Sequence, residues 1–481
     1  MSCLPFPSFV NQIPVDAKNK RAALSAAGSC RFDPLTCAPE FENDYIDICN
    51  KNKEQALVDC LEGNISKDEK KKLKKKYMKQ GVAMAGTYLT DTLKLDVSVV
   101  NVQVVIDAKT IFDTDGCIAA CFLDAGCTTI VIDGKNLDAM YASKIPKERI
   151  VASFSGMNAI EKDDVTAALK LAGTISVPVT NLEEAETLLS YVPEESDKVI
   201  FELFDADTSS ATTELVAAIA KLAKDHKGKI ALVDPDATVL GTNYAACMRT
   251  DRADGLYTTV VCTRNNEALG LVYSAVSSII AAFECGRGVY YSRSRGGLWR
   301  KGDTSGHWQT LHRLDVDCDG DALKFTVTQN GGSFCHLYTL TCWGEPNGLR
   351  HLEQTLNERL KSAPMGSYTK RLFDDPQLLR DKLVEEAQEL SEAETKEEVA
   401  GELADVLYFA MARAVKAGVS IDDAVAVLDR RTRKVTRRKG DSKAFRIEAG
   451  DKILGNNKPA AVEPETAAPA ITAGGGENGK N

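Results

Sequence analysis

The residues best suited to chemistry lie in a stretch rich in cysteine and aspartate. It reads LDVDCDGDALKF and continues downstream as FCHLYTLTCW. It contains three potential thiolate ligands, Cys318, Cys335 and Cys342. Three protein ligands with an open fourth position form the usual catalytic zinc site, in which the ion lowers the pKa of its bound water toward neutrality. The spacing alone also fits a structural zinc site or simple buried cysteines.

Three aspartates surround the first of these cysteines, at Asp317, Asp319 and Asp321. Carboxylate oxygens are hard ligands that suit magnesium better than zinc. Because successive side chains of an extended strand point to opposite faces, we expect Cys318 to face one metal while the carboxylates face another. His336 follows the second cysteine, and it fits a proton shuttle as well as a histidine that only supports the site.

An EF-hand is the main competing interpretation of the aspartates. Asp315 would begin the loop, with further acidic residues at the third and fifth positions. The twelfth position is Thr326, where calcium binding needs a bidentate glutamate. The flanking residues also alternate as in strands and not as in helices. We therefore reject the EF-hand.

A basic, glycine-rich loop precedes the cysteines and reads GRGVYYSRSRGGLWRKGDTSGHWQ. Arginine forks and hydroxyl groups beside flexible backbone are typical of phosphate recognition, although such loops are often simply solvated. The candidate substrate-binding residues of this loop are Arg293, Arg295, Arg300, Lys301, Thr304 and Ser305.

A second set of carboxylates lies on two predicted helices nearer the C-terminus. Asp375 and Pro376 form an N-cap and first-turn pair for the helix PQLLRDKLVEEAQELSEAE. Thr395 and Glu398 form a capping box for the next helix, which we expect to end near Gly418. The candidate magnesium ligands on the two helices are Glu385, Glu386, Glu389, Glu402 and Asp405.

The acidic residues of the second helix interrupt an apolar sequence, and burying them is costly unless a cation compensates. On the first helix alone, a solvated charged face would be the usual explanation. Two facing helices with these residues would hold one or two magnesium ions, a nucleotide polyphosphate and an attacking water. The candidate catalytic residues of the chain are His336, Glu386 and Glu389.

The motifs SRSRGGLWRKGDTSG, DCDGDAL and CH, followed by the third cysteine, resemble phosphoribosyl-AMP cyclohydrolase. In that family the three cysteines bind zinc and the three aspartates bind magnesium, and all of these positions are filled here. The resemblance implies that zinc-activated water opens the adenine ring of phosphoribosyl-AMP between N1 and C6. It also implies a site that lies between two subunits.

The helical region resembles the all-α, MazG-like phosphoribosyl-ATP pyrophosphohydrolases through SYTKRLF, KLVEEAQEL, GELADVLYF and KVTRRKGD. The last motif adds Arg437, Arg438 and Lys439 as candidates for binding phosphate charge. The implied reaction releases pyrophosphate and phosphoribosyl-AMP, which is the substrate of the preceding domain.

The fusion of the two motif sets resembles the fungal-type enzymes of histidine biosynthesis. The stretches RTDRADGLYTTVV and GLVYSAVSSI add to this resemblance. It implies a homodimer that uses Zn²⁺ and Mg²⁺ on small-molecule phosphoribosyl nucleotides. Because a low-complexity tail follows the last motif, we expect no histidinol dehydrogenase domain.

Three folded domains have to position these residues. From about 97 to 235, short β-branched runs alternate with amphipathic stretches, which predicts βαβ units and a parallel sheet. The sequence assigns this α/β domain no activity. The predicted boundaries are 1–80 for an irregular segment, 81–245 for the α/β domain, 246–347 for a β-rich α+β cyclohydrolase domain, 348–445 for an all-α pyrophosphohydrolase domain and 446–481 for a disordered tail.

Bulk composition narrows the function classes. A chain of 481 residues exceeds one compact core. A net charge of −10 argues against a general nucleic-acid partner. No apolar run approaches the ~20 residues of a membrane span, and the first residues carry no secretory signal. The scattered cysteines indicate reduced thiols rather than a disulfide framework. We expect a cytoplasmic enzyme, with organelle targeting left open.

Two other functions fit parts of the sequence. One is a house-cleaning nucleotide pyrophosphatase whose zinc domain is structural, and the other is a non-catalytic nucleotide-sensing scaffold. Complete ligand sets in both domains favour the bifunctional hydrolase over either alternative.

Overall fold

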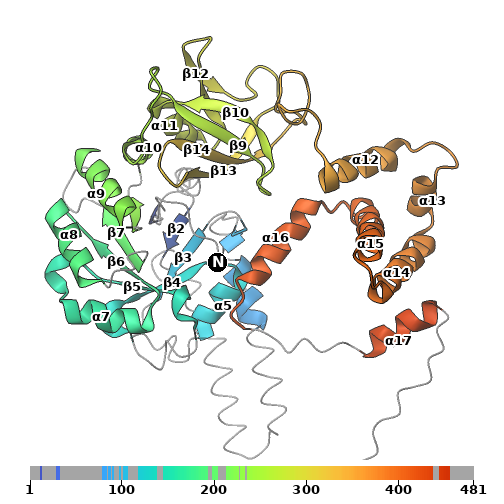
Figure 1. Ribbon diagram of the computed structural model, residues 1–481, viewed down its shortest axis with the longest axis horizontal. Coiled ribbons are helices and arrows are strands. Elements are labelled where there is room, and N and C mark those ends of the chain that lie inside the picture. The colour runs from blue at the N-terminus through green and yellow to red at the C-terminus, as the bar shows by residue number, and fades with distance from the viewer. Residues whose placement is uncertain are drawn as a thin grey trace, which may run out of the picture. The chain divides into compact units, whose positions relative to one another are not determined.

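The computed structural model describes residues 11–12, 29–32, 79–83, 85–87, 89–90, 97–98, 101–106, 117–137, 145–192, 198–203, 213–226, 228–232, 236–436 and 444–454. The chain forms two compact units (Figure 1). The first unit consists of Met1–His351 together with Val419–Arg438, and the second consists of Leu352–Gly418 and Lys439–Asn481. Helix α12 (Gly348–Ser362) begins in the first unit and continues in the second.

The first unit contains a parallel sheet in which each strand lies next to its neighbour in the sequence, in the order β1 to β8. All the pairings are parallel. The strands are β1 (Asn11–Gln12), β2 (Ser29–Phe32), β3 (Asn101–Val105), β4 (Thr129–Asp133), β5 (Ile150–Ser153), β6 (Thr174–Pro178), β7 (Val199–Leu203) and β8 (Lys229–Leu232). This sequential parallel order gives a half-barrel and confirms the predicted parallel sheet for β3 to β8. Strands β1 and β2 also belong to the sheet, although the sequence predicted an irregular segment over residues 1–80.

Helices follow the strands in alternation and cover one face of this sheet. They are α5 (Cys117–Ala125), α7 (Lys162–Leu171), α8 (Leu182–Tyr191) and α9 (Thr213–Asp225). Their buried side chains, such as Phe122 and Ile219, join the main apolar core. Among the described residues, the apolar side chains on the other face form a small cluster around Val131 and Val151. It also carries buried polar groups, including Glu202, which accepts a hydrogen bond from the Ser176 hydroxyl.

The β-rich part of the first unit follows the half-barrel. Its four-stranded sheet has the order β10-β9-β14-β13, and β11 pairs with β12 in a hairpin. The strands are β9 (Tyr257–Cys262), β10 (Ala268–Ser274), β11 (Val289–Ser292), β12 (Gly297–Arg300), β13 (Gln309–Val316) and β14 (Ala322–Gln329). This confirms the predicted β-rich region.

Two helices join the half-barrel to the β-rich part. Helix α10 (Ala237–Ala246) contacts both α9 and α11 (Val276–Cys285). The fully buried Tyr244 of α10 meets the ring of Phe283 on α11 edge-on, with the ring centroids 5.6 Å apart. The two parts therefore share one continuous apolar core.

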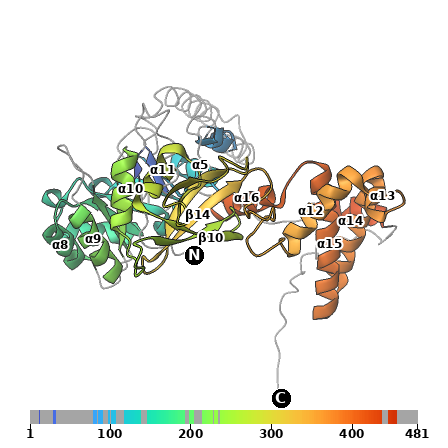
Figure 2. The ribbon, with the colours of Figure 1, turned by 90° about the horizontal axis from the view of Figure 1, so that it is seen from above.

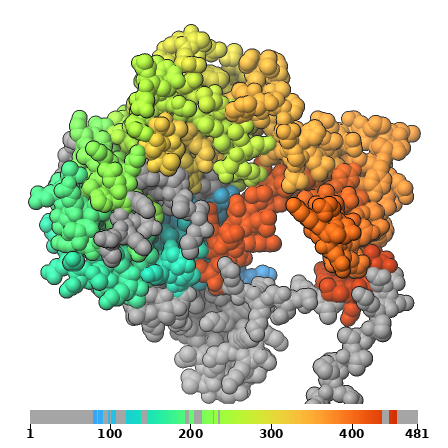
Figure 3. Space-filling view, viewed as in Figure 1, coloured from blue at the N-terminus to red at the C-terminus, as the bar shows by residue number. Residues whose placement is uncertain are grey.

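Helix α16 (Ile421–Thr432) also belongs to the first unit, where it packs against α5. In the space-filling view its red surface adjoins the cyan surface of the half-barrel (Figure 3). The Asp124 carboxylate of α5 accepts hydrogen bonds from the backbone N–H groups of Val435 (2.8 Å) and Thr436 (3.1 Å). Arg433 Nη1 donates to the carbonyl of Gly126 at 3.0 Å. The chain that follows α16 is therefore fixed to the half-barrel.

The second unit is helical, as predicted, and Figure 2 shows α14 and α15 side by side. Its helices are the rest of α12, α13 (Tyr368–Asp374), α14 (Pro376–Glu392), α15 (Lys396–Lys416) and α17 (Ala444–Ile453). Its core includes Leu356, Leu372 and Phe409. Helix α17 continues past residue 446, where the sequence placed the start of the tail.

The predicted helix boundaries of the second unit are confirmed. The Asp375 carboxylate caps α14 by accepting from the N–H groups of Gln377 and Leu378. The capping box of Thr395 and Glu398 opens α15, and Gly418 follows this helix with a left-handed φ of 70°. Among the described residues, no helix has the length and apolar character needed to cross a membrane.

Candidate active sites

The three aspartates lie in a tight turn between β13 and β14. The Asp317 carboxylate accepts N–H donors from Gly320 (3.0 Å), Asp321 (3.0 Å) and Ala322 (3.1 Å). Gly320 has a φ of 85°, which favours glycine. The expected extended strand through Asp317, Cys318 and Asp319 is therefore wrong, because the first aspartate captures backbone donors and closes a turn.

The turn gathers carboxylate oxygens of Asp317, Asp319 and Asp321 within 4.8 Å of one another. Partial burial raises the pKa of Asp317, and the neighbouring Asp319 and Asp321 raise it further. Arg249 lies 2.6 Å from Asp319 and lowers the pKa of that carboxyl. Lys224 also lowers the pKa of Asp319, and three crowded carboxylates with these two cationic neighbours fit a hard divalent cation such as magnesium.

Asp315, which would begin an EF-hand loop, does not join this cluster. It forms ion pairs with Arg313 on the same strand (2.5 Å) and with Lys324 on the neighbouring strand (3.4 Å). Strands, and not helices, flank the turn. The rejection of the EF-hand is confirmed.

Two of the three candidate zinc ligands come together. Cys335 accepts the N–H of Leu337 at 3.5 Å, and this contact, with the hydroxyl of Thr339 and the thiol of Cys342, lowers the pKa of Cys335. Partial burial and the neighbouring Cys335 raise the pKa of Cys342. His336 is exposed, with its Nδ1 3.8 Å from the Cys335 sulfur. This paired-thiol arrangement fits zinc.

Gly270 of β10 allows this arrangement, and our sequence reasoning missed it. The Cys342 N–H donates to the carbonyl of Leu269 at 2.8 Å, which brings the cysteine against the strand. A Cβ on Gly270 would lie 2.9 Å from the Cys342 sulfur and 2.3 Å from the Phe334 ring. A glycine inside a strand pattern signals such a close approach.

Cys318 lies in the aspartate turn and is exposed. Within the part of the chain that the structure describes, its sulfur forms no three-residue group within 4.8 Å with those of Cys335 and Cys342. One chain therefore brings two of the three predicted zinc ligands together.

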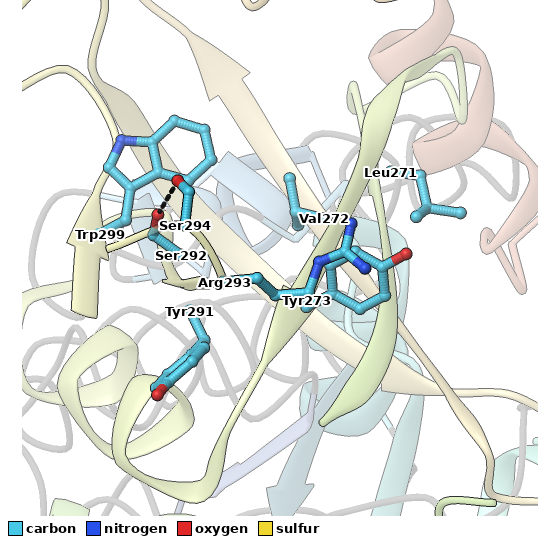
Figure 4. A pocket seen from close by; sticks show the side chains of 8 residues that line it. All are labelled: Leu271, Val272, Tyr273, Tyr291, Ser292, Arg293, Ser294 and Trp299. Atoms are coloured by element: carbon cyan, nitrogen blue, oxygen red, sulfur yellow. Dashed lines mark hydrogen bonds between the residues drawn. The ribbon is translucent and has the colours of Figure 1, made fainter. Parts of the chain in front are cut away.

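The candidate substrate-binding residues of the basic loop do not form one group. Lys301 is buried, and burial lowers the pKa of its ammonium group, while the nearby thiols of Cys342 and Cys335 raise it. Arg293 lines a pocket of about 540 Å³ beside Tyr273 (Figure 4). The remaining candidates, which are all exposed, are Arg295, Arg300, Thr304 and Ser305.

The second unit brings Glu386 and Glu389 of α14 together with Glu402 of α15. Their carboxylate oxygens lie within 4.8 Å of one another. Desolvation raises the pKa of Glu389, and Glu386, Glu402 and Glu385 raise it further. Among the described residues, Glu402 Oε2 is buried and has no hydrogen-bond partner. A buried acceptor without a donor, inside a group of carboxylates, fits a magnesium ion.

Two predicted ligands stand outside this cluster. Glu385 pairs with Lys382 at 2.9 Å, and the same ammonium group lies 2.6 Å from Glu386. Asp405 is exposed on α15. The predicted phosphate-binding residues Arg437, Arg438 and Lys439 lie outside the described residues.

Comparisons with known proteins identify both regions. Residues 270–344 match the family model for phosphoribosyl-AMP cyclohydrolase, and residues 349–432 match the model for phosphoribosyl-ATP pyrophosphohydrolase. The chain is 38% identical over 351 residues to the histidine biosynthesis bifunctional protein his7 of Schizosaccharomyces pombe, which covers 71% of this chain and 83% of that protein. The chain belongs to this family of histidine biosynthesis proteins. It carries both hydrolase domains, so the predicted family and enzyme class are confirmed.

Two further relatives come from other organisms and include a trifunctional protein. The chain is 56% identical over 198 residues to the histidine biosynthesis trifunctional protein of Kluyveromyces lactis, which covers 41% of this chain but only 25% of that protein. It is 31% identical over 196 residues to the bifunctional protein HisIE of Pyrococcus furiosus, covering 38% of this chain and 93% of that protein. Residues 1–269 lie outside the ranges matched by the two family models.

Proposed function

We propose that this protein hydrolyses phosphoribosyl-ATP to phosphoribosyl-AMP and pyrophosphate, and then opens the adenine ring of phosphoribosyl-AMP. The observation that carries the proposal is that each family-matched region holds its own group of acidic side chains that could bind a metal ion. The reactions are consecutive, because the product of the first is the substrate of the second. The two alternatives, a house-cleaning pyrophosphatase and a sensing scaffold, give no reason for both groups to be intact.

The pyrophosphohydrolase reaction is assigned to the helical unit. Glu386, Glu389 and Glu402 would hold magnesium, and the ion would offset the charge of the polyphosphate. Glu386 is the most buried of the three, and Lys382 fixes its carboxylate. We assign Glu386 and Glu389 to orienting the attacking water, and Glu385 and Asp405 to completing the ligand set when the nucleotide binds. The basic residues Arg437–Lys439 would receive the phosphates.

The cyclohydrolase reaction is assigned to the β-rich part. Cys318, Cys335 and Cys342 would hold zinc, which supplies a nucleophile at neutral pH by lowering the pKa of water. The carboxylates of the turn would hold magnesium, which offsets phosphate charge. His336 lies beside Cys335 and is exposed, so it is placed to move a proton. The basic loop would bind the phosphates through Arg293, Arg295, Arg300, Lys301, Thr304 and Ser305.

A homodimer would complete the zinc site. Cys318 stands apart from the other two thiols, so a second copy of the chain is the natural source of the third ligand. The β-rich part exposes Leu337 (70%), Tyr338 (78%) and Trp343 (65%), and a second copy would cover this apolar surface. In the helical unit, Val399 and Leu403 are exposed one turn apart on α15. We place this dimer in the cytoplasm, acting on small molecules and not on nucleic acid or membranes.

Incubation of purified protein with phosphoribosyl-ATP tests the proposal. Pyrophosphate and the ring-opened imidazole carboxamide should both appear, with a transient rise of phosphoribosyl-AMP. If zinc-loaded protein releases pyrophosphate but does not open the ring, the cyclohydrolase half of the proposal is wrong and the pyrophosphohydrolase half stands. The native mass, measured by light scattering, checks the dimer.

A further inference from the structure

One aromatic ring in the β-rich part carries two cationic neighbours. The guanidinium carbon of Arg293 lies 4.0 Å from the ring centroid of Tyr273, and that of Arg252 lies 4.4 Å from it. Cations over an aromatic face are attracted by the ring quadrupole. Tyr273 therefore restricts the conformations of both arginines, whose side chains would otherwise sample many rotamers.

The two arginines differ in how their charge is balanced. Arg252 forms a bidentate pair with Asp254, at 2.9 Å from Nε to Oδ1 and 2.7 Å from Nη2 to Oδ2. Both oxygens of Asp254 are thus used, and the Arg252 guanidinium lowers the pKa of this carboxyl. Across the described ranges, Arg293 forms no ion pair. The charge of Arg293 also lowers the pKa of Asp254, but both oxygens of that carboxylate are taken by Arg252, so the N–H donors of Arg293 remain available to an anionic ligand.

The space beside Arg293 has the size and chemistry of a small-molecule site. The pocket of about 540 Å³ falls within the range of ligand pockets. The hydroxyls of Ser292 and Ser294 line it, and their oxygens lie 3.3 Å apart (Figure 4). One of these hydroxyls can donate to the other, so a further donor remains for a ligand. The apolar wall comes from Leu271, Val272 and Trp299.

We propose that this pocket binds a phosphate monoester group through Arg293, Ser292 and Ser294, and that Tyr273 is the positioning residue that holds the Arg293 fork in place. Arg252, fixed by Asp254, packs over the same ring and supports it. The proposal rests on the proposed cyclohydrolase function and deepens it, because phosphoribosyl-AMP carries two phosphate monoesters. A bidentate arginine with two hydroxyls matches a dianionic phosphate better than it matches a neutral base or sugar.

Binding of adenosine 5′-monophosphate to the full chain tests the pocket without relying on turnover. Tyr273→Leu removes the ring, and we expect it to weaken this binding about tenfold. Tyr273→Phe keeps the ring without the hydroxyl and should restore wild-type affinity within about twofold. Arg293→Lys keeps the charge but loses the fork, and should also weaken binding. Adenosine, which lacks the phosphate, should bind all four proteins alike.

The same variants give a kinetic signature. With supplied phosphoribosyl-AMP, Tyr273→Leu should raise KM about tenfold and change kcat by less than about twofold, because the lost interaction binds ground state and transition state equally. Equal AMP affinity in the leucine and phenylalanine variants would overturn the proposal. So would an equal loss of adenosine binding, which would mean that the ring holds the base, or undetectable AMP binding by the wild type. If AMP binding follows the expected pattern but no ring opens, the proposed function fails and this pocket stands.

Discussion

Replacing Tyr244 by alanine should destabilise the β-rich part, although this residue precedes the region matched by the cyclohydrolase family. Tyr244 is fully buried and lies in the core shared by α10 and α11. Removing a buried aromatic ring costs about 3–5 kcal/mol, and the edge-on contact with Phe283 adds to this loss. With a urea dependence of about 2 kcal/mol per M, the unfolding midpoint should fall by about 1.5–2.5 M.

Tryptophan fluorescence reports on the β-rich part alone, because the 3 tryptophans of the chain are Trp299, Trp308 and Trp343. Urea titration followed at this signal measures the shift, and Tyr244→Phe is the matched control because it keeps the ring. Burial raises the pKa of Tyr244 well above its ordinary value. The folded state therefore resists ionisation, so the wild type should lose stability as pH rises through about 10, and the phenylalanine variant should lose less.

A urea midpoint of Tyr244→Ala within about 0.3 M of the wild-type value would contradict the conclusion that Tyr244 stabilises a core shared by the two parts. The shared core also bears on the stability of a truncated chain. Every catalytic motif lies after residue 245, so the sequence predicts that a fragment starting near this residue keeps both reactions if residues 1–240 only stabilise or regulate the protein. The structure predicts that a fragment starting at Asp236 is the more stable one, because it retains α10.

Three further substitutions separate the proposed activities. Cys335→Ala should abolish ring opening and lower the zinc content measured by atomic absorption, while pyrophosphate release continues. Normal ring opening by this variant would exclude Cys335 as a ligand of a catalytic zinc ion. Glu402→Gln should stop pyrophosphate release but leave ring opening of supplied phosphoribosyl-AMP intact, and equal loss of both in folded protein would contradict the two separate groups. Asp124→Ala removes the acceptor for Val435 and Thr436, at a cost of about 2–3 kcal/mol. Asp124→Ala should speed tryptic cleavage near Lys434 more than Asp124→Asn does. Equal cleavage rates in the two variants would contradict the view that Asp124 holds this segment.

The parts of the fold that could be predicted depend on local pattern. Alternation of β-branched runs with amphipathic stretches predicts strands β3 to β8 of the half-barrel, because the periods of strand and helix are both visible in that part of the sequence. Strands β1 and β2 lie before this alternation begins and were not predicted. Caps such as Asp375 and Thr395 predict helix starts because the capping side chain bonds within its own turn. The order of the strands and the packing of α10 on α11 depend on contacts between distant residues, which no local pattern records.

The candidate site divides in the same way. Residue types predicted which side chains could bind metals, and the structure brings Glu386, Glu389 and Glu402 together. The turn at Asp317 escaped prediction because its carboxylate competes with the strand for backbone N–H groups. The role of Gly270 was not predicted, because it depends on the clash that a Cβ would make with the Cys342 sulfur, and Cys342 is distant from Gly270 in the sequence.

The matched pyrophosphohydrolase region includes residues of both compact units, and we expect the half-barrel to support its C-terminal end. Residues 349–432 end with α16, which packs on α5 and belongs to the first unit. Asp124 and Arg149 then hold the chain after α16, since Arg149 Nη1 donates to the carbonyl of Arg433 at 2.7 Å. The segment so fixed leads directly into the basic residues Arg437–Lys439. Because the half-barrel holds the chain up to Thr436, we expect its removal to lower pyrophosphate release even though it supplies none of the assigned ligands.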